Sequence, residues 1–150
     1  MGEVTIKIKR FSHMTGIECP AYASKGSSGL DIRAAIEEPV TIEPGEIKLV
    51  PAGFAMEIPY GYEAQIRPRS GLALKHGIGI VNSPGTIDSD YRGEVNLILI
   101  NWGTQPFNIM PGERIGQMVI AKVCHAAIVE VPSLDDTERG KGGFGHTGMK

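Results

Sequence analysis

The chain of 150 residues has little cysteine, no excess of basic charge and no long apolar run. Its two cysteines, Cys19 and Cys124, lie far apart and lack the close spacing of metal ligands, so we expect two reduced thiols in a cytoplasmic protein. The formal net charge of -2 argues against a general nucleic-acid-binding protein, although a few local cations can still hold a small anion. No apolar run approaches a membrane span, and the first residues lack the basic-then-apolar order of a signal peptide, so we expect no membrane association.

Glycine and proline are abundant instead, with 20 and 10 residues, which favours short strands and many turns over long helices. Residues 12–28 show little periodicity and are expected to be mostly loop. We expect strands at 5–9, 29–35, 39–42, 47–50, 54–58, 62–66, 78–81, 95–100, 106–109, 114–123 and 126–131. Strands recurring at this short spacing predict one all-β domain over residues 1–150, built as a barrel or sandwich.

Residues 70–77 break the strand pattern and predict a short helix. Ser70 stands at a possible N-cap position, and Gly77 suits the position that follows the last turn. Arg67 and Arg69 come immediately before this segment, so free backbone N–H groups, a hydroxyl and arginines gather in one place. Two interpretations stay open here, an anion-binding site or a capped helix with solvated arginines.

The stretch 85–93 contains more charged and aromatic side chains than a chain turn needs. It lies between the apolar runs 78–81 and 95–100, which predicts two strands joined through a hairpin. A turn requires Gly, Asn or Asp, whereas here two carboxylates stand beside Tyr91 and Arg92. We therefore expect a functional site in this insert.

Gln117 and the glycine-rich tail each leave two interpretations open. Gln117 interrupts an otherwise apolar strand, so it is either a satisfied buried amide or a contact to a ligand. Residues 135–148 are too polar and too rich in glycine to form a core, and their composition predicts a mobile tail. The tail is either a disordered terminus or a lid that orders over a ligand, with its glycines admitting phosphate and Phe144 stacking on a base.

Five segments of the chain resemble, in order, the five motifs of the trimeric dUTPase family, the deoxyuridine 5′-triphosphate nucleotidohydrolases. They span residues 29–35, 67–73, 82–93, 114–119 and 139–148. The sequence Gly-Thr-Ile-Asp-Ser-Asp-Tyr-Arg-Gly of the third segment is intact, and the resemblance covers nearly the whole chain. It implies a jelly-roll-like fold, a homotrimer with active sites between subunits, and a flexible lid over about residues 135–150.

The resemblance also implies a reaction, the conversion of dUTP and water to dUMP and pyrophosphate. This reaction removes dUTP and supplies dUMP for thymidylate synthesis. Mg²⁺ would be held by the substrate phosphates and water, with no direct protein ligand, in keeping with the preferences of this ion. Asp88 would be the catalytic residue, orienting and activating the attacking water.

Further roles follow from the same resemblance. Tyr91 would pack on the deoxyribose and leave no room for a 2′-hydroxyl, while Asp88 would also bind the 3′-hydroxyl. Asp31 would be a supporting residue that partners an arginine. The other implied substrate contacts are Asn82, Gly85, Thr86, Ile87 and Asn96 around the nucleoside, Arg69, Ser70, Gly71 and Gln117 on the phosphates, and Arg139, Phe144, Gly145, His146 and Thr147 in the lid.

His146 departs from the family pattern, which usually has serine at this position. An imidazole still donates to phosphate, and its charge varies near neutral pH, so we hypothesise that it makes phosphate affinity pH-dependent. Two other functions stay open. One is a dCTP deaminase or bifunctional deaminase-diphosphatase, which needs a glutamate at the cytosine amine that we cannot assign. The other is a non-enzymatic binding module, for which loss of Asp88, Tyr91 or the tail motif would be expected, and all are present.

Overall fold

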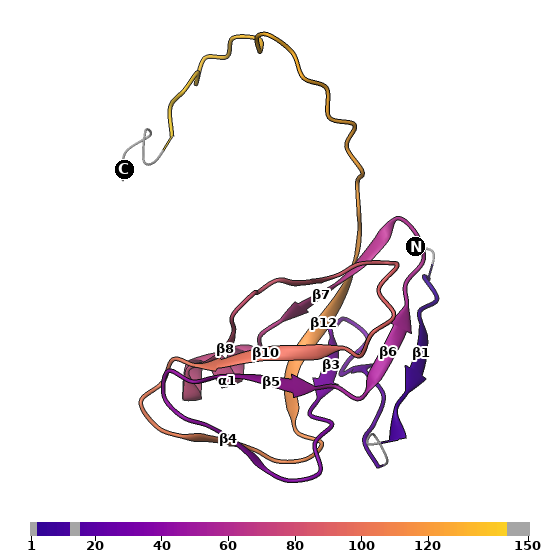
Figure 1. Ribbon diagram of the computed structural model, residues 1–150, viewed down its shortest axis with the longest axis vertical. Coiled ribbons are helices and arrows are strands. Elements are labelled where there is room, and N and C mark those ends of the chain that lie inside the picture. Colours follow the sequence, from indigo (N-terminus) through magenta and orange to yellow (C-terminus); the bar gives the residue numbers. More distant parts are fainter. Residues whose placement is uncertain (1–2, 13–15, 144–150) are drawn as a thin grey trace.

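The computed structural model describes residues 3–12 and 16–143, and across these residues the chain forms short strands and one short helix (Figure 1). The strands are β1 (Lys7–Arg10), β2 (Ala21–Tyr22), β3 (Leu30–Arg33), β4 (Val40–Ile42), β5 (Ile47–Pro51), β6 (Phe54–Glu57), β7 (Tyr62–Arg67), β8 (Ile78–Ile80), β9 (Gly85–Ile87), β10 (Asn96–Asn101), β11 (Phe107–Ile109) and β12 (Arg114–Lys122). The helix is α1 (Ser70–His76). Among the described residues, no helix combines the length and apolar character needed to span a membrane.

The strands pair in four antiparallel sheets around a common core. The largest has the order β2-β3-β12-β7-β9, the second has the order β5-β10-β8, and β1-β6 and β11-β4 form two-stranded ribbons. Within the described residues, only β2 and β3 are neighbours both along the chain and in a sheet. The other connections cross between sheets, as they do in jelly rolls. The predicted all-β, jelly-roll-like fold is therefore confirmed.

The core forms where inward side chains of these sheets meet. In β10, Leu97 and Leu99 are buried while Ile98 alternates outward. In β12, a register shift between Arg114 and Gly116 lets the side chains of Ile115 and Met118 both face the core, although they are three positions apart. The fully buried apolar side chains include Ile32, Ile42, Val50, Phe54, Leu97, Leu99, Ile109, Ile115 and Met118.

The glycine-bearing turns follow the sequence prediction. Gly45 has a φ of 81°, which suits the third position of a type II turn. The N–H of Glu46 donates to the carbonyl of Glu43 at 2.9 Å and closes that turn. The predicted turn before β7 is likewise present, with the N–H of Tyr62 donating to the carbonyl of Pro59 at 3.2 Å.

The predicted strand at 126–131 is wrong, because the chain leaves the sheets after β12. Residues 124–143, which we call the arm, extend away from the body of the protein (Figure 1). Ile128 is 91% exposed and Leu134 is 86% exposed. A strand requires a neighbouring strand for its backbone groups, and within the described part of the chain no strand pairs with residues 126–131. The apolar pattern of the arm is thus strand-like but unpaired in a single copy.

Candidate active site

The insert 85–93 connects β8 to β10 and contributes a strand of its own. β8 and β10 pair with each other, as predicted. The connection between them is more than a turn, because it contains β9, which joins the five-stranded sheet and pairs with β7. After β9 the chain turns sharply, and the N–H of Tyr91 donates to the carbonyl of Asp88 at 3.2 Å. The insert thereby links the two larger sheets and carries its polar side chains on the connecting turn.

Asp88, Tyr91 and Asn96 line one open cavity of about 310 Å³, together with Thr86 and Ile87. We call it the nucleoside cavity. The carboxylate of Asp88 is exposed to solvent. The structure therefore brings together five of the residues that the resemblance assigns to the nucleoside.

The aromatic ring of Tyr91 is held in place as one wall of this cavity. Its hydroxyl donates to the carbonyl of Glu94 at 3.0 Å. A Cβ added to Gly93 would come within 2.3 Å of the Tyr91 hydroxyl oxygen, so a larger residue at position 93 would displace the ring. The ring consequently has little freedom to move toward the main chain.

Asn82 and Gly85 lie together, beside the nucleoside cavity but not among its lining residues. A Cβ added to Gly85 would be 3.3 Å from Nδ2 of Asn82 and 3.5 Å from Cβ of Ile66. Gly85 therefore allows the Asn82 amide to approach the backbone of β9 closely. The side chain of Asn96 is used locally, since its Nδ2 donates to the carbonyl of Glu94 at 3.0 Å.

The start of α1 differs from the sequence prediction. Arg69, in an extended conformation, is the N-cap, and no side chain makes a capping hydrogen bond. Ser70 is instead the first helical residue, so its prediction as the N-cap is wrong. Gly77 ends the helix with a φ of 68°, and its N–H donates to the carbonyl of Ala73 at 3.0 Å, as predicted. Ser70 and Gly71 are both exposed at the helix start.

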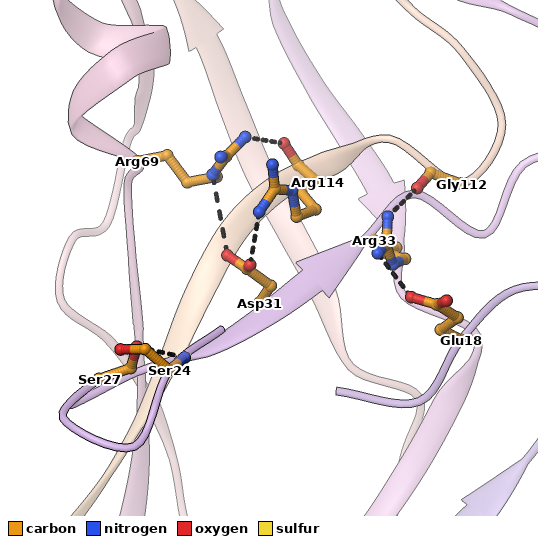
Figure 2. Close-up of polar contacts among 8 residues, drawn as sticks. All are labelled: Glu18, Ser24, Ser27, Asp31, Arg33, Arg69, Gly112 and Arg114. Atoms are coloured by element: carbon orange, nitrogen blue, oxygen red, sulfur yellow. Dashed lines mark hydrogen bonds and ion pairs between the residues drawn. The ribbon is translucent and has the colours of Figure 1, made fainter. Parts of the chain in front are cut away.

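Asp31 on β3 holds two arginines beside this helix (Figure 2). Its Oδ2 lies 3.0 Å from Nη1 of Arg114, and its Oδ1 lies 3.8 Å from Nε of Arg69. Nη1 of Arg69 also donates to the carbonyl of Arg114 at 3.0 Å. The prediction that Asp31 partners an arginine is confirmed. Arg114 was given no role by sequence reasoning, although it opens the fourth motif-like segment, 114–119.

The two arginines line a second open cavity of about 460 Å³, which we call the arginine cavity. Arg33 lines it as well, but its charge is compensated by Glu18 at 2.6 Å (Figure 2). Arg69 and Arg114 share the single carboxylate of Asp31, and guanidinium groups arranged in this way are suited to an anion. Glu113 also lines the cavity, and its carboxylate accepts from the N–H of Met110 at 3.0 Å.

Gln117 lies beside the arginine cluster with its amide already bonded. It stands opposite Asp31 on one side and Arg67 on the other in the five-stranded sheet. Its Nε2 donates to the carbonyl of Pro68 at 3.0 Å, and its Oε1 would be 2.8 Å from a Cβ added to Gly29. The structure thus shows a half-buried amide with a partner, and the contact to a ligand stays a prediction.

The nucleoside cavity and the arginine cavity share no lining residue. In the five-stranded sheet, Ile87 and Gln117 are two strands apart across the sheet and three residues apart along the strands. These two spacings place their Cα atoms roughly 14 Å from each other. Arg139 lies on the arm, where its Nε donates to the carbonyl of Gly142 at 2.8 Å. The lid residues Phe144, Gly145, His146 and Thr147 lie outside the described residues. In the described ranges, no three or more His, Cys, Asp or Glu side chains are grouped to hold a metal ion.

The chain matches the family model for dUTPase over residues 15–148. It is 55% identical over 147 residues to the deoxyuridine 5′-triphosphate nucleotidohydrolase of Rhizobium rhizogenes, covering 97% of this chain and 94% of that protein. The protein of the same name from Caldanaerobacter subterraneus subsp. tengcongensis is 53% identical over 146 residues, covering 97% and 99%. Among solved structures, the Staphylococcus bacteriophage 80alpha dUTPase with dUPNHPP has a TM-score of 0.86 at 26% identity, covering 97% and 99%. The chain therefore belongs to the dUTPase family.

Proposed function

We propose that the protein hydrolyses dUTP to dUMP and pyrophosphate, with Asp88 orienting and activating the attacking water. The observation that carries this proposal is the exposed carboxylate of Asp88 in one cavity with the fixed ring of Tyr91. The relatives support the substrate, because the proteins that match over nearly the whole chain are named deoxyuridine 5′-triphosphate nucleotidohydrolases.

Asp88 supplies the proton acceptor that water attack requires. Hydrolysis at phosphorus depends mainly on positioning and on neutralising charge, with little covalent work for the protein. A carboxylate within hydrogen-bond reach of a water orients its lone pair and accepts its proton. The bond between the Tyr91 N–H and the Asp88 carbonyl fixes the backbone from which this carboxylate projects.

Tyr91 selects the sugar by shape. Its ring is held by the bond from its hydroxyl to Glu94 and by its contact with Gly93. A deoxyribose packed on this fixed wall leaves no space for a 2′-hydroxyl, so a ribonucleotide is rejected by a clash.

The phosphates bind at the start of α1 and at the arginine cavity. Arg69 and Arg114 bring the cations, and Asp31 holds both guanidinium groups in position without neutralising them fully. Ser70 and Gly71 are exposed there to contact phosphate oxygens. The geometry thereby adds Arg114 to the residues that the resemblance implied.

The site residues fit a Mg²⁺ ion that arrives with the triphosphate. Asp31 is committed to two arginines, and no group of three or more His, Cys, Asp or Glu side chains forms around Asp88 in the described ranges, so neither belongs to a protein cage. Mg²⁺ favours phosphate oxygens and water over such cages. Bound in this way, the ion would neutralise part of the triphosphate charge.

We further propose a homotrimer in which neighbouring copies complete each site. The outward side of the β5-β10-β8 sheet supports it, because Leu49 stands opposite Ile98 and Ile47 stands opposite Ile100. Apolar side chains gathered in this way on a surface mark an interface between proteins. We call this surface the apolar face, and it consists of Ile47, Leu49, Val81, Ile98, Ile100 and Trp102.

The apolar face continues into the nucleoside cavity, because Leu49 and Ile98 belong to both. Ile47 is 54% exposed, Leu49 64% and Trp102 66% in a single copy. Covering this face with a neighbouring copy would also close one side of the nucleoside cavity. Closing the cavity would exclude bulk water from the reacting groups.

The arm supports the same arrangement. Residues 123–139, fully extended at about 3.3 Å per residue, reach roughly 55 Å, which is enough to cross to a neighbouring copy. The apolar stretch 126–131 would pair there, and Arg139 with the lid residues beyond it would close over the nucleotide. The lid contacts are proposals from the resemblance alone.

A nucleotide panel tests the proposed reaction. The protein is incubated with dUTP, dCTP, dTTP and UTP in turn, with Mg²⁺, and the release of pyrophosphate and ammonia is measured. We expect pyrophosphate from dUTP alone, and loss of that signal when the metal is chelated. Ammonia from dCTP would instead favour a deaminase, and no release from any nucleotide would favour a binding module.

A further inference from the structure

Arg92 closes the turn that carries Asp88. One guanidinium nitrogen, Nη1, donates to the carbonyl of Ser89 at 2.7 Å and to the carbonyl of Tyr91 at 2.9 Å. Within the turn itself, the backbone bond from the Tyr91 N–H to the Asp88 carbonyl is longer, at 3.2 Å. The side chain of Arg92 therefore supplies the shorter hydrogen bonds that fix the turn.

The turn needs such support because little of it is buried. Asp88, Asp90 and Tyr91 are exposed and Ser89 is only half-buried, so packing alone does not restrain the backbone. A catalytic carboxylate on an unrestrained turn would sample many positions. The same turn also presents the Tyr91 ring to the nucleoside cavity.

Arg92 also lies beside the β1-β6 ribbon. It lines an open groove over β1 and β6 together with Lys7, Met56 and Glu57. Lys7 lowers the pKa of the Glu57 carboxyl through a hydrogen bond, and Arg92 adds a smaller effect in the same direction. Met56 is buried in the core and anchors the ribbon on this side of the groove.

We propose that Arg92 is a positioning residue, which holds Asp88 and Tyr91 in their working arrangement. This role rests on the proposed hydrolysis of dUTP and assigns Arg92 no contact with the substrate. Two carbonyls accept from one planar guanidinium in fixed directions, which a lysine ammonium on a flexible stem reproduces only in part.

The test compares Arg92→Gln, Arg92→Lys and a matched control, Lys122→Gln. Lys122 is an exposed cation at the end of β12, so its substitution removes the same charge away from the turn. We expect Arg92→Gln to lower kcat for dUTP about 10- to 100-fold, the range for small misplacements of a catalytic group. KM should rise by a smaller factor than kcat falls, because Arg92 itself makes no contact with the substrate and only the positions of Asp88 and Tyr91 change. Arg92→Lys should lie between Arg92→Gln and the wild type, and Lys122→Gln should match the wild type.

Backbone hydrogen exchange provides the readout that separates positioning from general stability. In Arg92→Gln, the amide of Tyr91, which donates to the carbonyl of Asp88, should exchange faster, while those of β10 and β12 keep their wild-type rates. Normal kcat in Arg92→Gln would overturn the proposal, and so would a rise in KM at constant kcat, which indicates substrate binding. A wild type that does not hydrolyse dUTP overturns the proposed function itself, whereas an active wild type with unaffected Arg92 variants overturns only the positioning role.

Discussion

Replacing Ile47 with glutamate should separate the copies that the apolar face is proposed to join. Ile47 lies opposite Ile100 on that face and is 54% exposed in a single copy. Complete burial of an isoleucine contributes about 1.5–3 kcal/mol, so covering the remaining half contributes about 1 kcal/mol per copy. The side chain does not line the nucleoside cavity, so any effect on turnover would come through assembly.

The introduced carboxylate weakens association further. An ionised group taken out of water without a partner costs several kcal/mol. The lost apolar burial and this desolvation cost together exceed about 4 kcal/mol for each contact. Because about 1.4 kcal/mol is a factor of ten, association should weaken by at least about 700-fold. Sedimentation velocity over a range of micromolar concentrations would then show single chains where the wild type shows trimers.

Leu74→Glu provides the matched control. Leu74 is 88% exposed on α1 and does not belong to the apolar face, so its substitution introduces the same charge at an unburied position. It should leave mass and turnover unchanged, while Ile47→Glu loses turnover per chain in step with dissociation. An Ile47→Glu variant that keeps the wild-type mass and turnover would refute the role of the apolar face.

Three further changes to the chain test the catalytic carboxylate, the lid and the core. Asp88→Asn should still bind dUTP in calorimetry but lose about 10²- to 10⁴-fold in kcat, and near-normal turnover would end its role as water activator. Truncation before Arg139 should leave a folded trimer with poor turnover, so full activity would contradict the lid. Asn101 is fully buried, donates to the carbonyls of Ile42 and Gln105 at 2.9 and 2.8 Å, and accepts from the N–H of Gly103 at 2.8 Å. Asn101→Ala should cost about 2 kcal/mol or more in denaturant unfolding, because one buried and two part-buried groups lose their partner, and a cost below about 1 kcal/mol would contradict this network.

Local signals in the sequence predict the turns and most of the strands. Gly45 and Gly77 adopt the positive φ angles that their positions require, because glycine lacks the Cβ that disfavours this conformation. The apolar run 95–100 predicts a strand where β10 forms. These features depend on a few neighbouring residues, so a single sequence suffices for them.

Pairing between distant segments is beyond such signals. The stretch 126–131 has the composition of a strand, but composition does not tell whether its partner belongs to the same chain. β9 pairs with β7 and not with the strands next to it along the chain, and the composition of the polar insert does not predict this pairing. The N-cap falls on Arg69 rather than Ser70 because the extended backbone of Arg69 decides the helix start.

In the candidate site, too, some features could be predicted from the sequence and others depend on pairing between distant segments. Asp88 and Tyr91 stand out because a turn does not require them, and the resemblance supplies their roles. The bond between Asp31 and Arg114 joins residues 83 positions apart and depends on the register of β3 against β12. The sequence marks Arg92 as a residue that a turn does not require. Its two backbone acceptors, the carbonyls of Ser89 and Tyr91, depend on the folded conformation of the turn.

Each active site is proposed to combine Asp88 of one copy with Arg69 of another. Mixing two inactive variants in one trimer tests this arrangement directly. Asp88→Asn and Arg69→Ala are purified separately, shown to be inactive on dUTP, then unfolded together and refolded as mixed trimers. If sites are shared, random mixing gives about one quarter of the sites both intact groups, so pyrophosphate release should return to about a quarter of the wild-type rate. If mixing restores no activity while wild-type protein refolds to full activity in parallel, both groups act within one chain and the shared site is contradicted.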